Sequence, residues 1–117
     1  MTKLSKLIIT AAITALSACA SAPGKIDTSK LHFVEENHAE INMNGQIYIL
    51  DSYIIPFQRP YHILIQKASG KPIMANEALQ MATDYIKSRG CTTSPVRRAD
   101  LDGSNLDKTQ WLIGVEC

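Results

Sequence analysis

The 117-residue sequence lacks the features that identify several large classes of protein. It has no block of basic residues, and 12 Lys and Arg against 11 Asp and Glu give a net charge of only +1. Binding to nucleic acid needs clustered cations, so this balance argues against a nucleic-acid partner. The chain also has no internal repeat, no low-complexity segment and no apolar run of the ~18 residues that a membrane-spanning helix requires.

Catalytic motifs are also absent. The sequence contains no GxSxG, HExxH or P-loop pattern. Glu35 and Glu40 lie near His38, but consecutive strand residues point to opposite faces, so these groups do not converge obviously on one site. His32 and His62 have no second ligand at a useful spacing. The sequence therefore assigns no catalytic residue, no metal ligand and no cofactor.

What the sequence does contain fits one small globular domain. Hydrophobic residues make up 45% of the chain and charged residues 20%, which is close to the average for soluble globular proteins. A chain of 117 residues is the size of one domain. The first 18 residues differ in composition from the rest, so the domain is expected to begin after them.

Residues 1–18 have the composition of a secretory signal. Lys3 and Lys6 precede an uncharged segment at 7–16, and small residues follow it. As a helix, this segment would span only ~15 Å, about half of a bilayer core, which is too short for a stable transmembrane anchor. The alternative is a buried helix at the N-terminus of the domain.

Residues 16–19, with the sequence LSAC, resemble the lipobox of bacterial lipoproteins. The resemblance implies lipidation of the Cys19 sulfur, cleavage before Cys19 and acylation of the new amino group. Residue 20 is Ala rather than Asp, which by similarity to the sorting rule of enteric bacteria implies the outer membrane. The alternative is an ordinary secretory signal cut after Ala18, Ala20 or Ala22. The resemblance covers only the first nineteen residues and identifies no family for the domain behind them.

Three cysteines are present, Cys19, Cys91 and Cys117. If lipid occupies the first, an even pair remains in an oxidising compartment, and a disulfide between Cys91 and Cys117 is expected. The loop it would close corresponds to roughly 3.5 kcal/mol of stabilisation in the chain-entropy model. A zinc site built from these cysteines and histidines is the alternative, but no CxxC or HxxxH spacing supports it.

The remaining chain predicts a flexible tether at 19–30 and one α+β domain at 31–117. Strands are expected at 31–36, 39–43, 46–55, 61–67 and 110–117, with a further possible strand at 95–101 and a loop from 102 to 109. Asn44-Gly45 predicts a type I′ hairpin turn. In the last strand, Trp111, Ile113 and Val115 share one face with Cys117 and are expected to face the helix.

An amphipathic helix is predicted at 76–89, with its apolar stripe formed by Ala78, Leu79, Ala82, Tyr85 and Ile86. Gly90 is expected to end this helix with a left-handed cap. Together these elements predict an antiparallel sheet of four to six strands with one helix across a face.

Two segments suggest binding sites. Residues 100–107 have oxygen-bearing side chains in an order similar to a calcium loop, but Gly103 is fourth rather than sixth and Trp111 is twelfth. A loop that uses Asp, Asn and Gly for their turn conformations is favoured. The segment around the two prolines carries a possible interaction surface formed by Tyr53, Phe57, Arg59 and Tyr61. The alternative is that its aromatic residues belong to the core.

The sequence thus predicts a non-catalytic lipoprotein, anchored in the outer membrane with its domain in the periplasm, that binds a protein or envelope component. One alternative is an inhibitor of an envelope-directed hydrolase; small disulfide-containing lipoproteins include lysozyme inhibitors, although the known all-β ones lack a helix such as 76–89. Another alternative is a small envelope hydrolase. A deep pocket with two carboxylates or a His–carboxylate pair would favour the hydrolase, and a shallow surface would favour binding.

Overall fold

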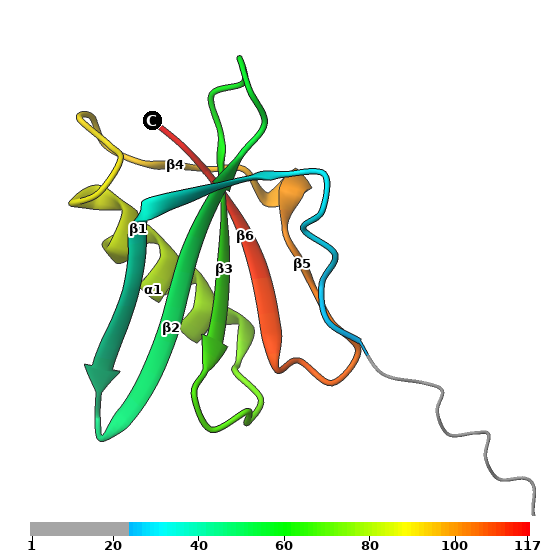
Figure 1. Cartoon of the computed structure of the whole chain (residues 1–117). Coiled ribbons are helices and arrows are strands. Elements are labelled where there is room, and N and C mark those ends of the chain that lie inside the picture. The colour runs from blue at the N-terminus through cyan, green and yellow to red at the C-terminus, as the bar shows by residue number, and fades with distance from the viewer. Residues whose placement is uncertain (1–23) are drawn as a thin grey trace, which may run out of the picture.

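A six-stranded antiparallel sheet with one face covered by helix α1 forms the domain, as Figure 1 shows. This is a computed structural model, and it describes residues 24–117. The α+β fold predicted from the sequence is confirmed.

The elements follow one another as three long strands, the helix, two very short strands and a final long strand. Their bounds are β1 (His32–Met43), β2 (Gln46–Ile54), β3 (Tyr61–Lys67), α1 (Ala75–Lys87), β4 (Val96–Arg97), β5 (Gly103–Ser104) and β6 (Gln110–Glu116). The sheet order is β1-β2-β3-β6-β4, and β5 pairs with the same edge of β6 as β4 does. The long strand β1 therefore lies at one edge of the sheet, and the two short strands lie at the other.

The helix and the inward face of the sheet enclose the core. The predicted stripe of α1 is confirmed, because Ala78, Ala82, Tyr85 and Ile86 are buried and Leu79 packs against them. Sheet residues opposite the stripe are also buried: Leu50, Ile63, Ile65, Ile113 and Val115. The small Ala78 and Ala82 side chains allow the helix to approach the sheet closely, and each is fully buried.

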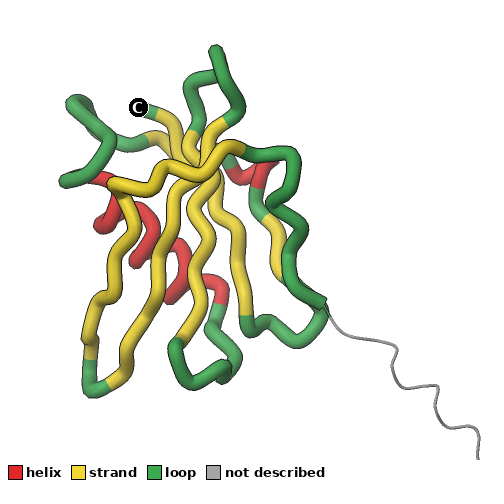
Figure 2. The backbone as a smooth tube through the Cα atoms, viewed as in Figure 1, coloured by secondary structure: helices red, strands yellow, loops and turns green. Residues whose placement is uncertain are grey.

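Strand β1 corrects the prediction of two short strands. It runs continuously from His32 to Met43 but contains a bulge, since Val34 pairs with Ser52 while Ala39 pairs with Leu50. Four residues on β1 thus face one on β2, and β1 turns sharply at this point (Figure 2).

Helix α1 supports this bulge through hydrogen bonds of Tyr85. The Asn37 side chain is buried and donates a hydrogen bond to Ser52 Oγ over 3.4 Å. The Tyr85 hydroxyl donates to the Asn37 carbonyl and lies 2.7 Å from Ser52 Oγ. The polar run at 35–38 interrupts the strand's apolar alternation in the sequence. The strand nevertheless continues through it, and the Tyr85 hydroxyl satisfies the buried Asn37 carbonyl.

Gly90 corrects a second prediction. It has no positive φ and forms no left-handed cap; the chain leaves α1 through turns in which the Arg89 and Gly90 amides both donate to the Ile86 carbonyl. A Cβ atom at Gly90 would lie 2.6 Å from the Tyr61 ring. Glycine is needed here because Tyr61 packs directly against the backbone.

The segment before β6 differs from the predicted strand and loop. Only Val96–Arg97 pairs as a strand, Ala99–Leu101 forms a 3-10 turn, and Gly103–Ser104 in the expected loop forms β5. The reason is Gly114 in β6, whose amide donates to Asp102 and whose carbonyl accepts from the Arg98 amide. A Cβ atom at Gly114 would lie 2.7 Å from both Arg98 O and Leu101 Cβ. The absence of a side chain at Gly114 therefore lets residues 98–101 pack directly against β6.

The N-terminal part of the described chain is also attached to the sheet. The Ile26 amide donates to Gln110 Oε1 over 2.8 Å, and Asn105 Nδ2 donates to the Gly24 carbonyl over 3.1 Å. The tether was predicted to extend to Lys30, but these two bonds attach the chain to the domain from Gly24 on. Sequence alone could not find them, because they join residues more than 80 positions apart.

Candidate functional site

The β2–β3 loop carries the most exposed large apolar side chain of the described residues, Phe57, at 107% relative exposure. The Gln58 amide donates to the Ile55 carbonyl over 2.9 Å, which closes a β-turn with Pro56 in its second position. Phe57 occupies the third position with φ at 70°. Proline followed by a positive φ is the pattern of a type II turn, where glycine is the favoured third residue.

This loop projects from the upper end of the sheet in Figure 1, beyond the ends of β2 and β3. Phe57 therefore combines two unfavourable features. A bulky side chain at positive φ strains the backbone, and a fully exposed ring gains nothing from burial. Such a residue is a candidate for a binding role, because folding alone would favour glycine there.

Charged side chains lie beside this turn, around a hollow of about 300 Å³ that includes Arg59, Val96, Arg98 and Glu116. Arg59 is largely exposed, and its Nε lies 3.8 Å from a Glu116 oxygen. Arg98 bonds Glu116 and Asp100 over 2.8 Å each. The Arg98 guanidinium lowers the pKa of the Asp100 carboxyl by hydrogen bonding, and these carboxylates raise the pKa of Arg98. Arg59, Arg98 and Glu116 of this network thus line an open hollow.

The predicted interaction residues do not form one surface. Phe57 and Arg59 lie together in the projecting loop. Tyr53 pairs with His62 on the sheet face opposite α1, where its ring centroid lies 5.5 Å from that of Phe33. Tyr61 lies on the helix side, packs against the core and donates a hydrogen bond to the Gly90 carbonyl over 3.3 Å. Only Phe57 and Arg59 of the four are thus placed at the projecting turn.

A His–carboxylate pair lies on the face of the sheet away from α1. His38 Nδ1 is 2.5 Å from Asp51 Oδ1, and His38 Nε2 is 4.0 Å from a Glu40 oxygen. The hydrogen bond and negative charge of Asp51 raise the pKa of His38. Sequence reasoning missed this pair, although the hairpin register could have revealed it: counting back from Asn44-Gly45 sets residue 38 opposite residue 51.

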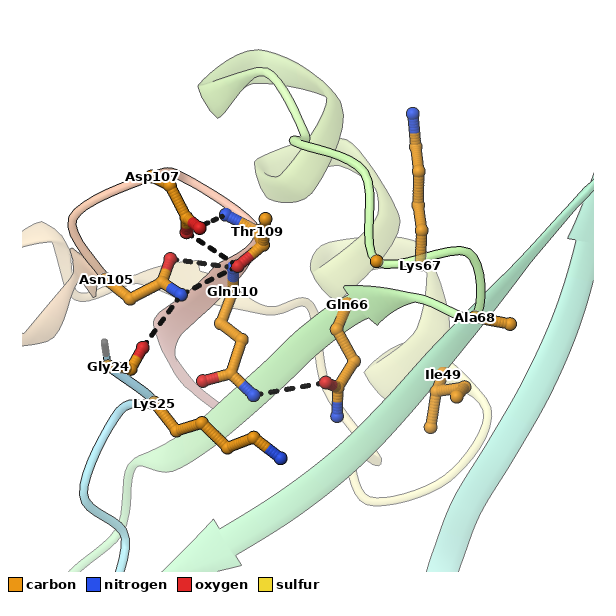
Figure 3. Close-up of a pocket in the computed structure, with 11 residues that line it drawn as sticks. Gly24, Lys25, Ile49, Gln66, Lys67, Ala68, Asn105, Asp107, Thr109 and Gln110 are labelled. Atoms are coloured by element: carbon orange, nitrogen blue, oxygen red, sulfur yellow. Dashed lines mark hydrogen bonds between the residues drawn. The ribbon is translucent and has the colours of Figure 1, made fainter. Parts of the chain in front are cut away.

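The opposite end of the sheet has a wider groove of about 440 Å³, shown in Figure 3. Its floor is the side chains of Ile49, Gln66 and Gln110, and Gln110 Nε2 donates to Gln66 Oε1 over 3.1 Å. Lys25 reaches across the open side in Figure 3, while the Lys67 side chain extends away from it. The groove is lined by the first described residues, the β5–β6 loop, β2, and β3 with the loop that follows it.

Neither hollow has the features expected of a hydrolytic pocket. The wide groove includes one carboxylate, Asp107, and the smaller hollow includes one, Glu116. The His38–Asp51 pair belongs to neither, and the His38 side chain is 45% exposed. Both hollows are open to solvent, and each has a single carboxylate side chain in its lining.

The carboxylates of residues 100–107 are directed to separate partners. Asp100 bonds Arg98, Asp102 bonds Arg97 and the Gly114 amide, and Asp107 accepts from Thr109, which lowers the pKa of Asp107. Within residues 24–117 no three His, Cys, Asp or Glu side chains gather as a metal site would require. In the structure, these carboxylates form turns and ion pairs within the domain.

Cys91 and Cys117 form a disulfide with their Cα atoms 5.5 Å apart, as predicted. It joins the segment after α1 to the end of β6, beside Tyr61 and Gly90. The predicted lipidation residue, Cys19, lies outside the described residues. Over the range 24–117, no helix has the length and apolar character needed to cross a membrane.

No protein-family model, curated protein or solved structure matches this chain.

Proposed function

We propose that this chain is a non-catalytic lipoprotein, anchored in the outer membrane through Cys19, whose periplasmic domain binds a protein partner with the Phe57 turn. The observation that carries the binding role is Phe57 itself, fully exposed and held at positive φ. Aromatic and arginine side chains are enriched at the energetic centres of interfaces. Phe57 would fill an apolar pocket of the partner, and the exposed Arg59 would pair with an acidic group beside it.

The membrane and compartment assignments are supported by the N-terminal sequence and by the cysteines. The LSAC segment ends a signal-like region, and two acyl signals are enough for stable membrane attachment. The Cys91–Cys117 disulfide fits an oxidising compartment such as the periplasm.

Site-specific photocrosslinking tests the binding role. A photoreactive phenylalanine at position 57 of the full-length protein, irradiated in living cells, is expected to form one discrete adduct. The same group at the exposed Gln80 of α1 is the control and should form none. Adding Arg59→Glu to the position-57 protein should reduce the adduct without changing its expression. Equal adducts at positions 57 and 80, or none at either, would contradict the proposed surface.

The anchor is tested separately with Cys19→Ala. This variant should retain residues 1–18, lose incorporation of labelled palmitate and leave the membrane fraction. Equal palmitate incorporation in the wild type and the variant would rule out lipidation at Cys19. Because the domain is unchanged in this variant, the result is independent of the crosslinking experiment.

Inhibition of an envelope-directed hydrolase is the second candidate function. A projecting loop on a disulfide-bonded domain has a suitable shape for entering an enzyme cleft. If the crosslinked partner is a hydrolase, the purified domain should inhibit it, and Phe57→Ala should weaken the inhibition. A partner without hydrolase activity would exclude this function.

A further inference from the structure

The first described residue, Gly24, lies at the end of the sheet opposite the Phe57 turn (Figures 1 and 2). We call this the loop end; it consists of the β1–β2 turn, the β3–α1 loop and the β5–β6 loop. The loops are linked to one another, since the Ala68 amide donates to the Ile47 carbonyl and the Ile73 amide donates to the Lys108 carbonyl. Asn105 of the β5–β6 loop binds the Gly24 carbonyl.

The distance from a lipidated Cys19 to this end is short. Gly24 and Ile26 are hydrogen-bonded to the domain, so only the five residue steps from Cys19 to Gly24 separate the lipid from the sheet. Five steps reach at most about 18 Å when fully extended. Strand β2, with nine residues, is about 30 Å long. The anchor therefore keeps the loop end close to the membrane and permits the Phe57 turn to lie away from it.

The surface of the loop end has the composition of a membrane-contacting surface. It carries four of the seven large hydrophobic residues that are exposed in the described chain: Met43, Ile47, Met74 and Leu106. Leu106 is 94% exposed in the loop that binds Gly24. Apolar side chains next to cations are typical of proteins that lie on a bilayer surface.

Cations are also more numerous than anions at this end. The lysines are Lys25, Lys67, Lys71 and Lys108; the carboxylates of the loops and of the start of α1 are Glu77 and Asp107, and Glu40 of β1 lies opposite Ile49. Two of these carboxylates accept hydrogen bonds within the domain, Glu77 from Tyr48 and Asp107 from Thr109. A surplus of lysine suits the phosphate groups of anionic lipids.

We propose that the loop end rests on the membrane that holds the lipid anchor, with Leu106 inserted at the interface and the lysines among the lipid phosphates. This proposal rests on the lipidation of Cys19 proposed above. It orients the domain, so that the Phe57 turn points away from the membrane toward a partner.

Tryptophan quenching tests this orientation. The purified lipoprotein is reconstituted into vesicles of phosphatidylethanolamine and phosphatidylglycerol, with or without brominated acyl chains. Leu106→Trp places a reporter at the loop end, and Phe57→Trp places a matched one at the opposite end; Trp111 is common to both and is corrected with the wild type. The emission added by Leu106→Trp should be quenched by brominated lipid, and that added by Phe57→Trp should not. Adding Lys25→Glu and Lys71→Glu should reduce the quenching.

A second arm makes the result independent of natural lipidation. The mature chain, made without lipid, is coupled through its Cys19 thiol to a maleimide-bearing lipid in the same vesicles; Cys91 and Cys117 are already bonded. Selective quenching of the Leu106→Trp reporter in this arm supports the orientation even if the native protein proves not to be lipidated. Equal quenching of both reporters, quenching of neither, or stronger quenching at position 57 would overturn it.

Discussion

Replacing Phe57 by glycine should stabilise the domain while weakening its binding. Phe57 is held at φ 70°, and its ring is fully exposed, so the substitution removes backbone strain and no buried contact. The substitution should therefore raise stability and lower binding. A residue retained for function shows this combination, whereas replacing a residue retained for structure would lower stability.

The expected gain follows from two backbone terms. A residue with a Cβ in the left-handed region costs about 1–2 kcal/mol relative to the right-handed region, and glycine does not carry this cost. Glycine loses about 0.5–1 kcal/mol more conformational entropy on folding. The difference leaves a stabilisation of about 0.5–1 kcal/mol. For a domain of this size, that is an increase in melting temperature of about 2–8 °C.

Thermal melts followed by circular dichroism measure this gain, with the disulfide intact. Phe57→Ala is the matched control, because it removes the same ring but keeps a Cβ at positive φ. It should melt within about 0.5 kcal/mol of the wild type. Both variants should lose the crosslinked partner to the same extent in a competition assay. If Phe57→Gly is no more stable than Phe57→Ala, the turn is not strained and the argument for a retained functional residue fails.

Three further predictions concern the core, the β1 bulge and pH. Ala82→Glu places a charge against the sheet and should lower the free energy of unfolding in urea by more than about 3 kcal/mol. Thr83→Lys, at the neighbouring half-buried position, should lower it by only about 0.5 kcal/mol. A larger loss for Thr83→Lys than for Ala82→Glu would mean that α1 presents a different face to the sheet. Tyr85→Phe removes the hydroxyl that donates to the buried Asn37 carbonyl and one of the two hydrogen bonds of Ser52 Oγ, and it should cost about 1–3 kcal/mol. No loss of stability would refute the role of Tyr85 in supporting the bulge. Because the pKa of His38 is raised above 6.5, the stability it contributes should be complete below that pH and be lost as pH rises through the raised value. His38→Gln should remove this decline in unfolding experiments at a series of pH values, and an unchanged decline would contradict the His38–Asp51 pairing.

The parts of the fold that depend on local pattern could be predicted from the sequence. Asn44 and Gly45 both have positive φ, as the type I′ turn expected of an Asn-Gly pair requires. The stripe of α1 follows from helical periodicity, and its ends are within two residues of the prediction. The disulfide followed from counting cysteines once Cys19 was assigned to lipid.

The parts that failed depend on residues distant in the chain. Gly90 looked like a helix cap, but it is required by Tyr61, 29 residues earlier. The bulge in β1 depends on Tyr85, 48 residues after Asn37. Such contacts leave no local pattern in the sequence. Gly90 fits a helix end and Tyr85 fits the apolar stripe of α1, so neither residue indicates its distant partner. Phe57 is different: it was predicted as part of an interaction surface around the two prolines, but its positive φ and full exposure are visible only in the folded chain.

The packing beneath the Phe57 turn explains how the domain can hold a strained residue so far from its core. Tyr61, which starts the strand after the turn, pairs with Val115 in the sheet and packs against Gly90 at the end of α1. The next residue, Cys91, is bonded to Cys117 just beyond β6. The sheet, the helix end and the disulfide thus fix the base of the loop from three sides, and strained conformations persist where the surroundings determine them in this way. A fixed base also lowers the entropy lost when a partner binds. The disulfide should therefore contribute to affinity at Phe57 by holding the base of the loop in place.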